Sequence, residues 1–468
     1  MEYKKIIWIS LDTLRADCIK FNKNKLYPNE YKVKTSINNS KFDELCAKGC
    51  FFANAISVAP YTSASHAAYF TGLWPKNNGL YDQFNSKLNA KTVFELAKRA
   101  GYTTIFKTDF PFILGKYLNM IRGVDKYIIE NNESVLTEIK NNEKVFSFIH
   151  FGQIHYPYGF HNLKFGGEDY IKKIEFLEKK YDIKPEEINL EDMAIETFRT
   201  KEDLSLLYRY KKIIARLYSN KNDDALFNLY LEGINYFHKN LFNKFLEKLF
   251  KILENEDYLV IISSDHGEAW NEETYGHHNS SDEGVIRVPI LFIAKDIKPK
   301  LYSNRIRTID VAPTLNDLLF KSKYKFDGKS LSKIIYKNII EKDRFAFSSV
   351  WVNESKDVLE KVHKILKDDK LSTQRNISIK YSATVYQDKY KYIINYKKFL
   401  NRSERIADFK KERLLRIENL EVLSPIKDIR KILEMKKMVE EYNNIKPITR
   451  KSQKEIMKEY FNLMGYKI

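Results

Sequence analysis

Short apolar runs alternate with amphipathic stretches along the first two thirds of the chain. Runs rich in β-branched and aromatic residues predict strands at 5–10, 101–106, 145–149, 259–263 and 288–294. Residues 92–100 predict a helix between two of these strands. Because strands separated by helical stretches are typical of a parallel sheet covered by helices, we predict an α/β fold with a large, mostly parallel sheet sandwiched by helices.

The remaining segments follow other patterns. Residues 163–222 are highly charged and helical, which predicts an insertion, and 229–249 have apolar residues at the spacing of one long helix. Residues 381–396 predict a β-hairpin that turns near Gln387 and Asp388, and 401–468 are charged and largely helical in pattern. We therefore predict a large domain at 1–340 that contains the insertion, and a small subdomain at 341–468 that combines the hairpin with a helical tail.

Composition narrows the class of protein. Of the 468 residues 43% are hydrophobic and 14% aromatic, which excludes overall disorder. No apolar run approaches the roughly 18 residues of a membrane-spanning helix, and the N-terminus lacks the apolar region of a signal peptide, so we expect a cytoplasmic protein. The three cysteines form neither a disulfide framework nor a zinc pattern.

The formal net charge is +18, from 80 basic and 62 acidic residues. Such a balance favours an anionic substrate, or association with an anionic membrane surface or polymer. The basic residues are scattered, which is equally typical of a solvated surface and does not specifically indicate nucleic acid.

Polar side chains that could catalyse a reaction or bind a metal follow the predicted strands, where open α/β sheets place their ligands. Asp12 ends the first strand and suits a divalent cation or a helix cap. Thr62 or Ser63 opens a helix, either as a nucleophile near an anion site or as a plain cap. His155 follows a strand and suits a residue that protonates a leaving group, one that binds substrate, or a structural histidine. Asp265 and His266 together suit Zn²⁺, Mn²⁺ or a similar ion, or else a capping Asp beside a structural His. Six of the nine histidines lie in these segments: His66, His150, His155, His266, His277 and His278.

In their order and spacing these segments resemble the sulfatase family of the alkaline phosphatase superfamily. Residues 11–17 look like the family's first metal motif, 264–268 like its second, and 155–158 like its His-x-Pro-Tyr segment. Residues 62–66 occupy the place of the catalytic Cys-x-Pro-Ser-Arg signature, and Thr71-Gly72 keeps the spacing to it. The resemblance implies an alkaline phosphatase-like fold and a metal-dependent ester hydrolase.

Several residues depart from the family pattern. Sulfatases mature a Cys or Ser into formylglycine, and Thr62 does not yield that aldehyde. The motif's Pro and Arg are Ala64 and His66, and the usual paired Asp-Asp is Asp12-Thr13. Thr62 is instead similar to the nucleophilic Thr of the superfamily's phosphodiesterases and phosphoethanolamine transferases.

The resemblance therefore implies a role for each candidate residue. Thr62 would be the nucleophile, His155 would protonate the leaving oxygen, and His277 would contact the substrate oxyanion or complete a second metal site. A divalent cation (Zn, Mn, Ca or Mg) would be bound by Asp12, Thr62, Asp265 and His266. The substrate-binding residues would be Ser65, His66, Asn78 and His278.

Three functions are compatible with these residues. The first is a hydrolase or transferase of phosphate (di)esters that uses Thr62. The second is a sulfuric ester hydrolase that works without formylglycine. The third is a non-catalytic member of the fold that binds an anion, and retention of Asp12, Asp265 and His266 argues against it.

Overall fold

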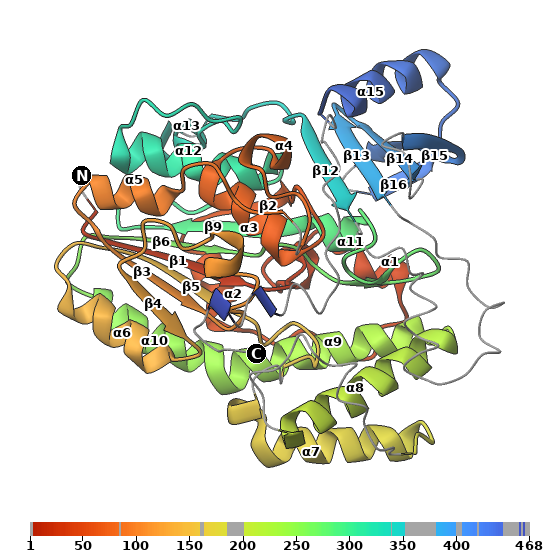
Figure 1. The fold of residues 1–468 in the computed structure, drawn as a ribbon, viewed down its shortest axis with the longest axis horizontal. Coiled ribbons are helices and arrows are strands. Elements are labelled where there is room, and N and C mark those ends of the chain that lie inside the picture. The colour runs from red at the N-terminus through yellow and green to blue at the C-terminus, as the bar shows by residue number, and fades with distance from the viewer. Residues whose placement is uncertain are drawn as a thin grey trace.

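A mostly parallel sheet forms the centre of the molecule (Figure 1). The structure is a computed structural model and describes residues 3–83, 86–159, 163–184, 201–337, 339–351, 381–398, 405–418, 421–442, 458–459 and 462–463. In this part of the chain the sheet has nine strands, in the order β10-β2-β9-β6-β1-β5-β3-β4, with β11 also paired to β2. These strands are β1 (Lys5–Leu11), β2 (Cys50–Ile56), β3 (Thr103–Thr108), β4 (Lys126–Ile129), β5 (Val145–Phe151), β6 (Tyr258–Ser263), β9 (Arg287–Ile293), β10 (Lys300–Tyr302) and β11 (Ile306–Arg307).

All five predicted strands are present, and the predicted helix at 92–100 is α5 (Val93–Arg99). One strand, β9, runs antiparallel to both of its neighbours, β2 and β6. The other pairs in this sheet are parallel. The predicted α/β architecture is thus confirmed, and the sheet is mostly rather than entirely parallel.

Helices cover both faces of the sheet (Figure 1). One layer contains α3 (Thr62–Thr71), α5, α12 (Val311–Leu315) and α13 (Ser332–Lys337), and the other contains α2 (Lys41–Cys46), α6 (Asn132–Asn141), α9 (Asp223–Phe237) and α10 (Asn243–Leu253). The short helices α1 (Tyr27–Glu30), α4 (Pro75–Asn78) and α11 (Glu283–Ile286) lie in connections. No helix of the described residues is long and apolar enough to cross a membrane.

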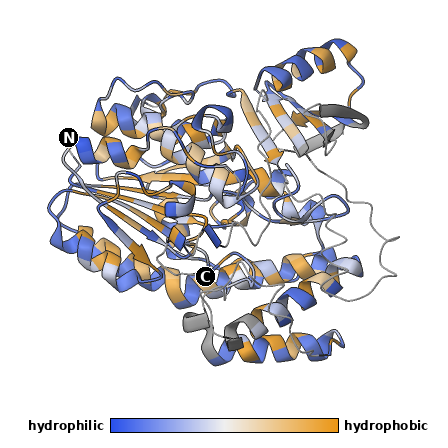
Figure 2. Cartoon of the chain, in the orientation of Figure 1, coloured by the Kyte–Doolittle hydropathy of each residue, from blue (hydrophilic) through white to orange (hydrophobic). Residues whose placement is uncertain are grey.

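Strand β1 is buried on both faces, as central strands of such sheets are. Ile6 and Trp8 belong to one hydrophobic core, whereas Ile7, Ile9 and Leu11 belong to the core on the opposite face. Figure 2 shows hydrophobic residues along the strands and on the helix faces that cover them. The alternation has the two-residue period of a strand, so Asp12 leaves β1 with its position set by seven buried residues.

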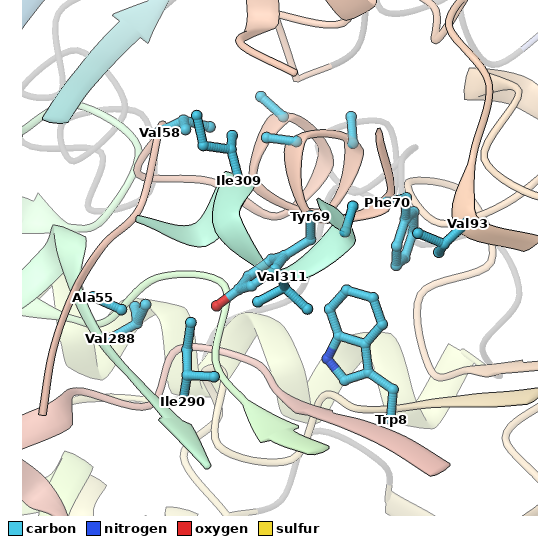
Figure 3. Close-up of a cluster of buried hydrophobic side chains, with 14 of the residues drawn as sticks. Trp8, Ala55, Val58, Tyr69, Phe70, Val93, Val288, Ile290, Ile309 and Val311 are labelled. Atoms are coloured by element: carbon cyan, nitrogen blue, oxygen red, sulfur yellow. The ribbon is translucent and has the colours of Figure 1, made fainter. Parts of the chain in front are cut away.

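In the core on the α3 side, the rings of Trp8, Tyr69 and Phe70 lie among aliphatic side chains (Figure 3). The Trp8 ring packs edge-on against Tyr69 and Phe70 of α3, with centroids 5.4 and 5.7 Å apart. The Tyr69 hydroxyl donates to the Ser264 carbonyl at 2.8 Å. Helix α3 is therefore held both to β1 and to the residue that precedes Asp265.

The predicted insertion contains α7 (Leu163–Lys180) and α8 (Lys201–Ser219), which lie outside α9 (Figure 1). The single helix predicted at 229–249 is longer than expected and comprises α9, a π-helical turn at His238–Phe242, and α10. Asn222 caps α9 by accepting from the Ala225 N–H, so the helix begins where the insertion was predicted to end.

A small antiparallel sheet precedes the final long helix. Its order is β12-β13-β14-β15-β16, and the predicted hairpin is β13 (Tyr381–Gln387) and β14 (Tyr390–Lys398), with Asp388 at positive φ in the turn. The predicted domain boundary at 340 stays a prediction, and the sheet begins with β12 (Ala346–Trp351).

The helical prediction for 401–468 is wrong in its first part. This part forms β15 (Arg405–Glu418) and β16 (Glu421–Pro425), and the helix α15 (Ile429–Tyr442) begins after them. Pairing of β15 with β14 along the sheet outweighs the weak strand preference of its lysines and glutamates. Most of 443–468 lies outside the described residues.

Candidate active site

The chemistry-bearing residues meet at the carboxyl ends of β1, β5 and β6 and at the first turn of α3. Asp12 follows β1 directly, Asp265 and His266 follow β6, and Thr62 is the first residue of α3. The Thr62 hydroxyl donates to Asp12 Oδ2 at 3.2 Å and lies 3.4 Å from His266 Nε2. Asp12, Thr62, Asp265 and His266, predicted as one metal site, are thus brought together and are all buried.

The three ligand-type side chains fit a divalent cation. One ligand atom from each of Asp12, Asp265 and His266 can be chosen so that all lie within 4.8 Å of one another. Asp12 Oδ1 and Asp265 Oδ2 are buried and have no hydrogen-bond partner in the described part of the chain. His266 Nδ1 donates to the Gly267 carbonyl at 3.0 Å, which leaves the Nε2 lone pair for a metal. Two carboxylate oxygens and an imidazole nitrogen suit Zn²⁺ or Mn²⁺.

Thr13 does not take the place of a second carboxylate. It adopts a left-handed conformation with φ of 61°, and its hydroxyl donates to the Asp12 carbonyl at 2.7 Å. Its backbone N–H donates to Asp265 Oδ1 at 3.2 Å. Thr13 therefore orients Asp265 through its backbone, while its side chain is turned to its own loop.

His150 on β5 is a site residue to which the sequence pattern gave no role. Its Nε2 donates to Asp12 Oδ2 at 3.0 Å. Burial raises the pKa of Asp12, but the hydrogen bond from His150 and the nearby His266 outweigh burial and hold that pKa below its ordinary value. The clustering of histidines after strands was the one signal in the sequence that pointed to this residue.

His277 and Glu268 form a buried pair beside the metal-ligand group. His277 Nδ1 and Glu268 Oε1 are 3.0 Å apart, and the His277 ring lies 4.4 Å from His266 and 5.0 Å from His155 between centroids. Burial, followed by the neighbouring histidines, lowers the pKa of His277 well below its ordinary value. Burial, reinforced by Asp12, raises the pKa of Glu268. Gly276 has φ of 73°, a conformation that favours glycine, and a Cβ there would lie 2.6 Å from Glu268 Oε1.

His155 lies beside His277, with the two ring centroids 5.0 Å apart. Its Nδ1 is 3.0 Å from the Tyr156 carbonyl, which directs Nε2 away from that carbonyl. Burial lowers the pKa of His155 from its ordinary value, although Asp12 opposes the shift. His155 and His277 are thus neighbouring imidazoles beside His266.

The predicted substrate-binding residues have partners within the protein. His66 Nε2 is 2.8 Å from Ser10 Oγ and its Nδ1 is 2.8 Å from the Thr62 carbonyl, and burial lowers its pKa to about 4. Ser65 Oγ donates to the Ala59 carbonyl, and Asn78 Oδ1 accepts from the Leu80 N–H.

These contacts favour positioning roles for His66, Ser65 and Asn78 over the predicted contact with substrate. A neutral His66 does not reproduce the charge of the family's Arg. His278 differs from the three, because it is half-buried, has φ of 72° and packs with its ring tilted against that of His277, at 3.9 Å between ring centroids.

Comparison with known proteins finds solved structures that share the fold. A structure from the glycosaminoglycan-metabolism locus of Bacteroides thetaiotaomicron has a TM-score of 0.58 at 15% identity, covering 94% of this chain and 97% of that chain. A protein solved with its substrate D-glucosamine-2-N,6-O-disulfate has a TM-score of 0.58 at 15% identity, covering 98% and 99%. A phosphonate monoester hydrolase from Silicibacter pomeroyi has a TM-score of 0.56 at 13% identity, covering 94% of each. At such identities the likeness shows the fold.

No curated protein sequence matches the chain. The family model described as Sulfatase matches residues 4–321, which is more than half of the chain. The matched range includes every residue placed in the site above. The chain belongs to the sulfatase family.

Proposed function

We propose that the protein is a metal-dependent hydrolase or transferase of phosphate (di)esters, with Thr62 as its nucleophile. The observation that carries the proposal is the place of the Thr62 hydroxyl, 3.2 Å from Asp12 Oδ2 and 3.4 Å from His266 Nε2 at the start of a ten-residue helix. Although this position holds neither Cys nor Ser, Thr62 still supplies a hydroxyl group that can act as the nucleophile.

The start of α3 suits a tetrahedral anion. The first N–H groups of a helix lack partners within the helix, and the helix dipole is positive at this end. A phosphoryl group placed there would face Thr62 Oγ1. A divalent cation bound by Asp12, Asp265 and His266 would offset the negative charge on the phosphoryl oxygens and favour the ionised hydroxyl.

The chain's own residues supply the remaining steps. The Thr62 Oγ1–P bond forms while the P–O bond to the leaving group breaks, and the hydroxyl proton passes to solvent, because Asp12 Oδ2 has a lowered pKa and accepts the hydrogen bond without taking the proton. His155 protonates the departing oxygen, and His277 contacts the phosphoryl oxygens. Water then attacks this phosphorus and releases phosphate from a monoester substrate or a phosphate monoester from a diester, whereas in a transferase a second alcohol attacks and takes up the phosphoryl group, and in each case the Thr62 Oγ1–P bond breaks.

A sulfuric ester hydrolase is the second candidate function. Membership of the sulfatase family and the fold shared with a protein solved with a disulfated glucosamine favour a sulfate ester. The side chain of Thr62 argues against it, because this residue does not yield formylglycine. Association with an anionic membrane surface finds no support in these comparisons.

Turnover of matched esters tests the proposal. The protein is assayed with Mn²⁺ or Zn²⁺ on bis(4-nitrophenyl) phosphate, a phenylphosphonate monoester and 4-nitrophenyl sulfate. We expect the highest kcat/KM on the phosphodiester and, by mass spectrometry, a trapped 4-nitrophenyl phosphoryl group on Thr62. Preference for the sulfate ester would favour the second function, and no turnover of any ester despite bound metal would favour an anion-binding protein.

A further inference from the structure

We propose that His150 is a positioning residue that holds Asp12 so that a single carboxylate serves both the cation and the Thr62 hydroxyl. This inference rests on the proposed metal site and names a residue outside the family's motifs. His150 is fully buried on β5 and donates from Nε2 to Asp12 Oδ2 at 3.0 Å.

Strand register places His150 beside Asp12. In the parallel pairing of β1 with β5, His150 lies opposite Ser10, and the Asp12 N–H donates to the Phe151 carbonyl at 2.9 Å. Ser10 and Asp12 are two residues apart, so their side chains leave the same face of the strand. The imidazole therefore reaches Asp12 from a neighbouring strand with its backbone already fixed.

A second buried pair fixes the other side of His150. Lys107 Nζ donates to the His150 carbonyl at 2.8 Å and pairs with Asp109 Oδ1 at 2.6 Å. Asp109 Oδ2 accepts from the Gly152 N–H at 3.0 Å, and the Asp109 N–H points to His150 Nδ1 at 3.5 Å. This contact is long, but it gives Nδ1 a donor and so agrees with a proton on Nε2.

The hydrogen bond to the Asp12 carboxylate requires the same tautomer of His150. A carboxylate only accepts hydrogen bonds, so the bond to Asp12 needs the proton on Nε2 of His150. Asp12 Oδ2 then receives two donors, His150 and Thr62, whereas Oδ1 has none among the described residues. One oxygen is committed to the nucleophile's side and the other is left for the cation.

This division has a reason in the sequence. The family's first motif carries two aspartates, and here the second is Thr13, whose side chain bonds the Asp12 carbonyl. With one carboxylate fewer, the orientation of Asp12 decides more of the cation's affinity. Partners that orient a metal ligand typically change metal affinity by about 10–100-fold when they are lost.

The test compares His150→Gln with His150→Asn, whose amide N–H groups lie at different distances from the backbone. Gln at position 150 places its Nε2–H near the position of the imidazole Nε2–H, whereas Asn is too short to reach Asp12. Binding of Mn²⁺ alone is measured by calorimetry on the full chain without substrate, and the melting temperature of each metal-free variant is recorded. We expect His150→Asn to weaken Mn²⁺ binding at least tenfold and His150→Gln to remain within about threefold of wild type.

Wild-type Mn²⁺ affinity in a folded His150→Asn variant would overturn the inference, as would equal losses in both variants. If His150→Asn does not fold, His150→Gln decides: near-wild-type affinity supports the role, and a tenfold loss overturns it. Recovery of His150→Asn turnover by excess Mn²⁺ would further support positioning. Because binding is measured without substrate, the result is independent of whether Thr62 is the nucleophile.

Discussion

Thr62 Oγ1 donates to Asp12 Oδ2 across a sequence separation of 50 residues. Ser63, the next residue, is buried, and its hydroxyl has no hydrogen-bond partner among the described residues. Adjacent side chains on a helix point in different directions, so one hydroxyl of the pair faces the carboxylate. Of the two hydroxyls that the sequence offers as nucleophiles, that of Thr62 contacts Asp12 and that of Ser63 does not.

We expect Thr62→Ala to lower turnover of a phosphodiester by several orders of magnitude, because it removes the attacking oxygen. Thr62→Ser keeps that oxygen and retains measurable turnover, and Ser63→Ala costs about tenfold or less. Steady-state kinetics at saturating Mn²⁺ check the series, together with mass spectrometry of residue 62. Turnover of Thr62→Ala equal to that of wild type would remove Thr62 from the mechanism.

Chelation should reduce both activity and stability. A ligand present at 100 times its Kd stabilises the native state by about 2.7 kcal/mol, because it binds the folded site and not the unfolded chain. We expect EDTA to lower the melting temperature of wild type and to leave Asp265→Asn nearly unchanged, since this variant loses a ligand oxygen. Differential scanning calorimetry with and without Mn²⁺ measures both. Equal metal-dependent stabilisation of the two proteins would place the cation elsewhere.

Stability should fall in mild acid, partly because of a histidine remote from the site. His238 lies in the π-helical turn, where burial lowers its pKa to about 4, and it packs on Phe42 and Phe242. An unfolded histidine has a pKa of about 6.5, so the unfolded chain binds the additional proton and stability is lost as pH falls from about 6.5 toward 4.

We therefore expect His238→Phe to reduce the loss of stability between pH 7 and pH 5 by about 2 kcal/mol. Denaturant unfolding of both proteins at the two pH values measures this difference. Phosphodiester turnover at pH 7 serves as the control and should change little. An unchanged pH slope would mean that His238 is protonated to the same extent in the folded and unfolded states.

The role of His155 is testable through the leaving group. A general acid matters most when the departing oxygen is a poor leaving group, so His155→Gln should slow an alkyl phosphodiester about 100-fold and a 4-nitrophenyl diester much less. His277→Gln is the matched comparison, since its ring lies 5.0 Å from that of His155 between centroids. If His277→Gln shows the leaving-group dependence and His155→Gln does not, the two roles are exchanged.

Much of the fold followed from local pattern. Apolar β-branched runs such as Ile6–Ile9 are buried between two helical layers whichever strands flank them. Their strand conformation could therefore be predicted from the sequence. The same runs end at Asp12 and Asp265, and the carboxyl ends of parallel strands meet at one edge of a sheet. The sequence thus determined which residues form the candidate metal site and that Thr62 opens a helix beside it.

Tertiary structure decided the features that depend on register and pairing. The contact of His150 with Asp12 joins residues 138 positions apart and exists because β5 pairs with β1 in one register. The charged segment of β15 is a strand because β14 offers it a hydrogen-bonding edge. Contacts with neighbouring elements also account for three further features. Strand β9 runs antiparallel to β2, the Thr13 hydroxyl bonds the Asp12 carbonyl, and His66 bonds Ser10. Local propensity fixes the conformation that a segment prefers, whereas its neighbours in space decide which groups it contacts.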